Sequence, residues 1–353
     1  MKTLFKYIFI LILTISFSYC SEDTPTVTQT KTDTGKWLIP KDEVYDGGPG
    51  RDGIPALDKL QFNNVENTNY LQNSSLVIAI NIDNEIRVYP HAILDWHEII
   101  NDAIGNNKFA ITYCPLTGSG IGWNRIIDGE ATTFGVSGLL YNTNLIPYDR
   151  KTGSNWSQMK LQSVNGPLIS KFVSVVPIVE TSWATIKSAF PNAKVVSTNT
   201  GYSRNYEQYP YGDYRTNNSS LLFPVDHKDN RVLAKNRVLG IFDGEKTKAY
   251  QIVDFSSPGE ILIDKFNSKR FLVYGNIAKN IIVAFDISNL DSTVTFKILD
   301  SDLPWIFKDS GNIKYNLFGI SANSNIKLKP AKSFISYWFA WAAFYPNTDL
   351  YER

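Results

Sequence analysis

Short apolar runs rich in valine and isoleucine, separated by turn residues, dominate the chain beyond residue 75. The predicted strands of the first series are residues 75–82, 85–89, 108–113, 120–126 and 131–136. Asp83-Asn84 and Asp128-Gly129 are typical tight turns, which join neighbouring strands into hairpins. A similar series of strands and hairpins follows residue 236. The pattern therefore predicts mainly β-structure.

Helical patterns in the chain are few and short. Asp95 resembles a helix N-cap with Glu98 three positions on, which predicts a helix from Asp95 to near Gly105. Residues 182–190 place their apolar side chains on one helical face before Pro191, and residues 337–344 predict an apolar helix. A parallel α/β sheet needs longer helices between its strands. We expect an α+β fold, mainly β with short helices and mostly antiparallel strands.

A series of residues recurs in the same order at an offset of about 160 residues. Asp83-Asn84-Glu85, Tyr89, His97-Glu98-Ile99 and Asp102 return as Asp243-Gly244-Glu245, Tyr250, Gly259-Glu260-Ile261 and Asp264. This recurrence predicts two degenerate repeats packed as a pseudo-twofold pair. The second copy has Gly259 at the place of His97 and Asn276 at the place of Cys114. Any nucleophile or soft metal ligand therefore belongs to the first copy.

The chain divides into segments of different character. They are a signal peptide (1–19), a flexible tether (20–38), a Gly/Pro-rich entry segment (39–75), repeat 1 with the cysteine and histidine (76–197), a Tyr-rich connector (198–236) and the degenerate repeat 2 (237–353). The connector carries five tyrosines among prolines, glycines and asparagines, between Tyr202 and Tyr214. We expect it to be irregular and to lie across the surface.

The N-terminus has the pattern of a secretory signal. Two lysines precede an apolar run from Tyr7 to Phe17, which is too short to span a membrane comfortably. Cys20 follows at the position where bacterial lipoproteins are cleaved and acylated. We predict an exported lipoprotein of the cell envelope, at the outer membrane or the cell surface, whose membrane partner is reached through a lipid on Cys20. The alternative is ordinary secretion or an uncleaved anchor, with Cys20 incidental.

Composition limits the function further. The 353 residues are 43% hydrophobic, which is enough for one large core or two smaller ones. The formal charge is +1 and no basic cluster is present, which argues against nucleic acid as a partner. If Cys20 is acylated, Cys114 is left as an unpaired thiol outside the cytoplasm, where such thiols need an explanation.

Cys114 is the candidate catalytic thiol and His97 its candidate partner. Cys114 follows a strand and precedes Pro115, where the amides of a helical turn would lower its pKa and favour the thiolate. Thr117 takes the resolving position of a Cys-x-x-Cys loop. His97 would deprotonate the thiol or share a metal with it. The alternatives are that Cys114 is a small buried apolar residue and that His97 braces the start of the helix.

A polar run from Tyr148 to Gln158 supplies further candidates. Asp149 and Arg150 orient a substrate, or they pin the loop by charge-assisted hydrogen bonds, which is the interpretation we favour. The candidate substrate-binding residues are Thr117, Asp149, Arg150, Trp156 and Gln158. Met159 with Cys114 and His97 would suit Cu(I), so copper is the one cofactor that the residues suggest. The other histidines have no second ligand at zinc spacing, and no metal site is assigned.

Several ordered motifs resemble a known family. They are Gly47-Gly48-Pro49, Asp52-Gly53-Ile54-Pro55, Trp96-His97-Glu98-Ile99, Tyr113-Cys114-Pro115-Leu116, Phe134-Gly135-Val136-Ser137-Gly138, Tyr148-Asp149-Arg150, Trp156-Ser157-Gln158 and residues 339–344. Together they resemble the bacterial domain-of-unknown-function family 3179, from Ile39 to the C-terminus. The resemblance implies an extracytoplasmic or lipoprotein setting and no established activity. Members often carry a second cysteine where this chain has Thr117, so dithiol redox chemistry is in doubt here.

Three functions remain open. The first is a lipid-anchored envelope protein with a thiol site at Cys114 and His97 for redox or metal-linked chemistry. The second is a non-enzymatic binding or structural module, whose small-molecule or protein partner is held at the connector and in a pocket between the repeats. The third is a cysteine-dependent acyl transferase or hydrolase, for which no oxyanion-hole motif is found. A buried sulfur surrounded by aliphatic carbons would favour the second.

Overall fold

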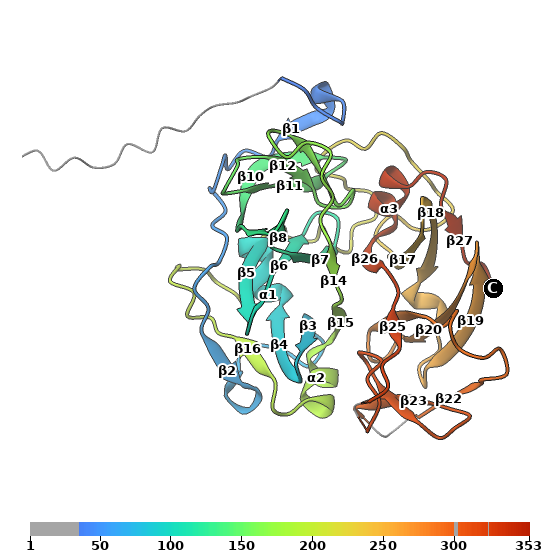
Figure 1. Ribbon diagram of the computed structural model, residues 1–353. Coiled ribbons are helices and arrows are strands. Elements are labelled where there is room, and N and C mark those ends of the chain that lie inside the picture. The colour runs from blue at the N-terminus through green and yellow to red at the C-terminus, as the bar shows by residue number, and fades with distance from the viewer. Residues whose placement is uncertain (1–34, 300–302, 324) are drawn as a thin grey trace, which may run out of the picture. The chain divides into compact units, whose positions relative to one another are not determined.

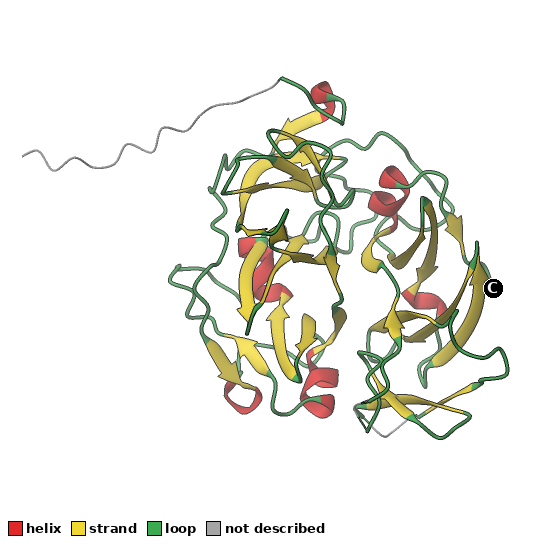
Figure 2. Ribbon diagram, in the orientation of Figure 1, coloured by secondary structure: helices red, strands yellow, loops and turns green. Residues whose placement is uncertain are grey.

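The computed structural model describes residues 35–299, 303–323 and 325–353. The predicted signal peptide, Cys20 and most of the tether lie outside these residues. Strands make up most of the regular structure, and the described α-helices α1, α2 and α3 have seven residues each (Figure 2). None of the described helices is long and apolar enough to cross a membrane. The mainly β fold with short helices and antiparallel pairing is confirmed.

The first half contains a hairpin, a helix and a three-stranded meander (Figure 1). In chain order its elements are β3 (Leu76–Ile82), β4 (Glu85–Pro90), α1 (His91–His97), β5 (Ile99–Ile104), β6 (Asn107–Cys114), β7 (Ser119–Asn124), β14 (Val175–Val176), β15 (Val179–Ser182), α2 (Trp183–Ala189) and β16 (Lys194–Val196). β15 pairs antiparallel with β3, and β16 pairs parallel with β4. Short 3-10 turns lie at Lys41–Glu43 and Val65–Asn67, and β2 (Phe62–Asn64) pairs with β16.

The second half repeats this order of elements. They are β17 (Arg237–Asp243), β18 (Lys246–Gln251), a 3-10 turn at Ile252–Asp254, β19 (Glu260–Phe266), β20 (Lys269–Asn276), β21 (Ile281–Asp286), β25 (Lys329–Pro330), β26 (Ser333–Tyr337), α3 (Trp338–Phe344) and β27 (Asp349–Leu350). β26 pairs antiparallel with β17 and β27 pairs parallel with β18, as β15 and β16 do in the first half. A pseudo-twofold axis between the halves stays a prediction.

Each half carries extra strands at the same point, after its meander. In the first half they are β8 (Ile126–Ile127), β9 (Glu130–Ala131), β10 (Phe134–Tyr141), β11 (Asn144–Asp149), β12 (Asn155–Ser157) and β13 (Gln162–Asn165), and β1 (Val44–Asp46) pairs with β10. In the second they are β22 (Phe296–Ile298), β23 (Trp305–Asp309) and β24 (Lys314–Asn316). The first insertion covers the end of β6, where Cys114 lies.

One sheet and one apolar cluster connect the halves. The sheet runs in the order β27-β18-β17-β26-β7-β6-β5, and it crosses between the halves where Ile335 of β26 pairs with Gly120 of β7. A Cβ at Gly120 would lie 2.5 Å from Cδ1 of Ile78, so a larger residue there would require the Ile78 side chain to move. The cluster joins Trp123 and Trp156 of the first half to Trp338 and Trp341 of the second. The halves therefore share a core.

The helix predicted from Asp95 to Gly105 is wrong. α1 ends at His97, because Glu98 takes a φ of 56° that a right-handed helix does not allow. Ile99 and Ile100 begin β5, where they pair with Thr112 and Ile111. Asp95 lies inside the helix rather than at its N-cap. The helix predicted at residues 182–190 is confirmed as α2, with Ser182 as its capping residue.

The connector, residues 198–236, has no helix or strand, as expected. Most of its residues are exposed or partly buried, but it does not simply lie across the surface. Tyr206 and Tyr214 are buried, and Lys235 is 6% exposed. Tyr214 donates a hydrogen bond to the carbonyl oxygen of Leu116. Leu116 belongs to the loop that follows β6, residues 114–118, which we call the cysteine loop. The connector therefore covers the end of β6 and supplies part of the core.

Candidate functional site

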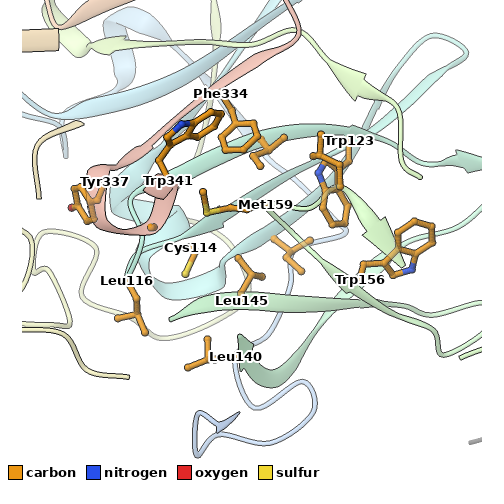
Figure 3. Packing of buried hydrophobic residues seen from close by; sticks show 14 of the residues in the cluster. Cys114, Leu116, Trp123, Leu140, Leu145, Trp156, Met159, Phe334, Tyr337 and Trp341 are labelled. Carbon is orange, nitrogen blue, oxygen red and sulfur yellow. The ribbon is translucent and has the colours of Figure 1, made fainter. Parts of the chain in front are cut away.

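Cys114 is the last residue of β6 and is 1% exposed. Figure 3 shows it among apolar side chains that include Leu116, Leu145 and Met159. Burial, with a smaller effect of the Glu98 charge, raises the pKa of the thiol to about 11. Hydrogen bonding from Thr117 and from the backbone of Leu145 lowers that pKa, as the sequence suggested, but burial outweighs it. Cys114 is therefore a neutral thiol at physiological pH.

His97 is fully buried at the end of α1, and both ring nitrogens are engaged. Nδ1 lies 2.7 Å from the carbonyl oxygen of Pro55, and Nε2 lies 2.7 Å from the hydroxyl of Tyr206. Since a carbonyl only accepts, Nδ1 donates to Pro55 and neutral Nε2 accepts from Tyr206. Burial lowers the pKa of His97, which favours this neutral form. The ring braces the entry segment against the connector, and no nitrogen is left for the thiol.

Glu98 is the acidic group that acts on the thiol, whereas the sequence pattern suggested only a capping role for it. Glu98 is 7% exposed. Burial raises the pKa of Glu98 to about 8. Its counterpart in the second half, Glu260, is partly exposed and pairs with Arg353. The two glutamates match in sequence but not in environment, and only the tertiary structure shows this difference.

Thr117 and Gln158 belong to a buried hydrogen-bond network. Thr117 Oγ1 lies 2.8 Å from Ser119 Oγ, and Ser119 Oγ donates to Gln158 Oε1 at 2.7 Å. Asn144 Nδ2 donates to the same Gln158 oxygen at 2.7 Å, and Gln158 Nε2 donates to Thr112 Oγ1 at 3.0 Å. Thr117, Ser119 and Gln158 are each fully buried. The network joins side chains of β6, β7 and β11, and a role of Thr117 and Gln158 in substrate binding stays a prediction.

Asp149, Arg150 and Trp156 form internal contacts. Asp149 is fully buried and accepts hydrogen bonds from Trp156 Nε1 at 3.1 Å and from the backbone N–H of Thr152 at 2.7 Å. Arg150 donates to Asp58 at 2.6 Å. These contacts fit the loop-pinning interpretation that the sequence favoured for Asp149 and Arg150. A role in substrate binding stays a prediction.

A buried charged cluster at α1 was missed by sequence reasoning. His91 Nε2 lies 3.5 Å from Glu180 Oε2, and Arg237 donates to the other oxygen of Glu180. Although burial opposes it, Arg237 and His91 hold the pKa of Glu180 below its usual range. Asp95, one helical turn after His91, binds Arg215 of the connector at 3.0 Å, and burial raises its pKa to about 6. The four-residue spacing of His91 and Asp95 would have indicated this face only if α1 had been predicted to begin at His91.

A cavity of about 970 Å³ lies between the two halves. The first half contributes Gly120 and the stretch from Val173 to Glu180, and the second contributes β21 and residues 327–335. Its apolar lining includes Val175, Val176, Ile178, Phe271, Ile282, Phe285, Phe318 and Phe334. This volume is at the upper end of the usual range for small-molecule sites. It lies between the halves, where the sequence suggested a pocket, but its lining includes no residue of the connector, which the sequence suggested as the other part of the binding site.

The described residues contain no group of three or more histidine, cysteine, aspartate or glutamate side chains arranged to hold a metal ion. Met159 shares the apolar cluster of Cys114, while His97 is engaged elsewhere. Among the described residues, Cys114, Met159 and His97 therefore do not converge as ligands for copper.

Comparison with known proteins gives one match. The model of a family described as a protein of unknown function, DUF3179, matches residues 51–348. No curated protein and no solved structure matches this chain. The match covers β3 to α3, and thus the cysteine loop, the buried charged cluster and the cavity.

Proposed function

This chain belongs to the DUF3179 family, and because that membership assigns no activity, we propose from its geometry that it is a non-catalytic ligand-binding module of the cell envelope. The observation that carries the proposal is the cavity of about 970 Å³ that both halves line. Binding sites of this size at the junction of two structural units are common. A ligand bound there would contact both halves and hold them together.

The state of the thiol supports a binding role over a catalytic one. A nucleophilic cysteine needs an accessible sulfur and a lowered pKa. Cys114 is buried, its pKa is raised to about 11, and His97 is committed to Pro55 and Tyr206. These features fit a structural cysteine in an apolar core.

The envelope setting of the proposal rests on the signal-like N-terminus and on Cys20. We expect a lipid on Cys20 to anchor the protein, with the tether before residue 39 giving it reach. Metabolic labelling with an alkynyl fatty acid tests this. The natural chain should incorporate the label and the Cys20→Ser variant should not, while equal labelling of both would contradict anchorage at Cys20.

A cavity-filling variant tests the binding function. Val175 lies on β14 and lines the cavity, so Val175→Trp should narrow the cavity and obstruct a ligand that contacts this wall. Native mass spectrometry of protein purified without detergent should detect a retained small molecule on the natural chain and little on Val175→Trp. Phe172→Trp, at an exposed position outside the lining, is the matched control. Equal retention by all three proteins, or no retained molecule on the natural chain, would contradict the proposal.

Thiol chemistry is the second candidate, and the buried carboxyl group of Glu98 is the observation that favours it. Glu98 is buried and its charge acts on Cys114, and burying an acid is costly to a purely structural core. Such chemistry would require the connector to move away from the cysteine loop, because Tyr214 now binds Leu116 there. In that state Glu98, rather than His97, would exchange a proton with the thiol.

A further inference from the structure

Exposed and buried parts of the cavity lining differ in chemistry. The apolar residues Ile282, Phe285 and Phe334 are each at most 3% exposed, so they form the interior of the cavity. The lysines Lys108, Lys327, Lys329 and Lys332, by contrast, are all exposed and therefore lie at its mouth. The cavity thus combines an apolar interior with a basic rim.

The rim carries positive charge that the protein does not neutralise. Lys329 pairs with Asp286 at 3.3 Å, and Lys269, also in the lining, pairs with Asp243 at 2.7 Å. Within the described parts of the chain, Lys108, Lys327 and Lys332 have no carboxylate partner. Of the other acids of the lining, Glu180 is paired with Arg237, and the exposed Asp83 accepts a hydrogen bond from Asn107, so the three lysines outnumber the one acid that has no cation partner among the described residues.

Lys332 is the best placed of these cations. It directly precedes β26, and its Nζ lies 5.1 Å from the ring centroid of Phe242, another residue of the apolar lining. The surrounding protein partly desolvates the ammonium group and lowers its pKa. A partly desolvated cation attracts an anionic partner more strongly than a fully hydrated surface lysine does.

Building on the proposed function, we propose that the cavity takes an amphipathic anion: one alkyl chain in the apolar interior and a carboxylate or phosphate head at Lys332. The alkyl chain would be removed from water by the aliphatic and aromatic walls, at a gain of about 25 cal/mol per Å² buried. The anionic head would stay at the mouth, where it keeps part of its hydration. A cationic head on the same chain would meet Lys332 and its unpaired neighbours instead.

Calorimetric titration of the full chain with matched twelve-carbon ligands, each below its critical micelle concentration, tests the ligand class. Dodecanoate and dodecyl phosphate should bind, dodecyl maltoside should bind more weakly, and dodecyltrimethylammonium should bind most weakly. The two anions separate a carboxylate from a phosphate head. Val175→Trp should weaken binding of both anions, which locates them in the cavity.

Variants of Lys332 test the role of the rim. Lys332→Gln should weaken binding of the anions about threefold to fivefold, the range expected for a partly exposed ion pair. It should leave the maltoside unchanged, and Lys332→Arg should retain the affinity for anions. Lys265→Gln, an exposed lysine on β19 outside the cavity, is the matched control.

The outcomes separate this inference from the function on which it rests. If the neutral or cationic ligand binds as tightly as the anions, or if Lys332→Gln binds the anions normally, the amphipathic-anion assignment is overturned. The ligand-binding function would survive that result, provided that the natural chain retains a molecule that Val175→Trp loses. If no twelve-carbon ligand binds, the assignment fails as well, and the retained molecule alone decides the function.

Discussion

Cys114 is held as a neutral thiol by the same packing that stabilises the first half. Leu116, Leu145 and Met159 surround it, and the connector lies over the loop that follows. Removing water from the sulfur disfavours the thiolate more than the hydrogen bonds from Thr117 and Leu145 favour that form. Reactivity at this residue is therefore governed by opening of the structure.

Alkylation of the Cys20→Ser chain, in which Cys114 is the remaining cysteine, measures this protection. We expect iodoacetamide to modify the native protein at least about a hundredfold more slowly than the urea-unfolded protein, because a buried group reacts through rare opening. His97→Ala, measured under conditions where it stays folded, should not slow the native reaction further. Rapid native alkylation that His97→Ala abolishes would instead support a Cys114–His97 site.

Glu98 makes stability depend on pH in a predictable direction. Burial raises its pKa in the folded protein from the ordinary 4.5 of a glutamate to about 8. Between these values the folded protein keeps a proton that the unfolded chain has released, so this residue's contribution to stability falls as pH rises from about 4.5 to about 8.

Glu98→Gln should remove that fall, which is at most about 1.4 kcal/mol per pH unit. The comparison is of urea unfolding of both proteins at several pH values, with the exposed Glu66→Gln as control. Parallel pH profiles for the natural chain and Glu98→Gln would show that Glu98 is ionised in the folded protein.

At the scale of elements, an equivalent tyrosine–aspartate hydrogen bond connects the hairpin to the meander in each half. The hydroxyl of Tyr89 on β4 donates to Asp102 on β5 at 2.7 Å, and that of Tyr250 on β18 donates to Asp264 on β19 at 2.7 Å. Asp102 and Asp264 also bind cations, Arg87 and Lys248 respectively. In both halves the acid thus connects the hairpin to the meander.

Tyr89→Phe and Tyr250→Phe should each lower the free energy of unfolding by about 1–2 kcal/mol, because each leaves a carboxylate with one partner fewer. Urea titration gives the values. The exposed Tyr202 offers a control, and Tyr202→Phe should change stability by less than about 0.5 kcal/mol. A loss at only one of the two sites would argue against equivalent roles in the halves.

For the whole molecule, the ion pair of Glu180 and Arg237 links the halves beside the cavity. Glu180 belongs to β15 and Arg237 to β17, and the acid is 3% exposed. A buried carboxylate that loses its cation is strongly destabilising, whereas removing both charges is often nearly neutral.

Arg237→Met should therefore lower the free energy of unfolding by about 3–5 kcal/mol, and Arg237→Met with Glu180→Leu should recover most of that loss. Urea unfolding measures both. Arg353→Met, which breaks the exposed pair with Glu260, is the control and should cost less than about 1 kcal/mol. A double variant as unstable as Arg237→Met would show that packing, rather than charge, joins the halves here.

Local patterns predicted the secondary structure well where turn residues were strong, and poorly at α1. Asp83 and Asn84 both adopt positive φ in the first hairpin, as their residue types indicate. The region around His97 has two overlapping patterns, a capping box and an apolar pair. It forms a strand after His97 because Ile99 and Ile100 pair with β6. Propensity is a weak guide where tertiary pairing competes with it.

The sequence by itself determined the β-rich fold, the order of elements that recurs in the two halves and the position of Cys114 after a strand, because turn chemistry and short-range apolar patterns specify these features locally. Only the tertiary structure decided the environment of each side chain. It buried Cys114 and Glu98 together, directed His97 to Pro55 and Tyr206, and opened a cavity between the halves. Burial and charge pairing depend on residues far apart in the chain, and these are what set pKa, accessibility and binding.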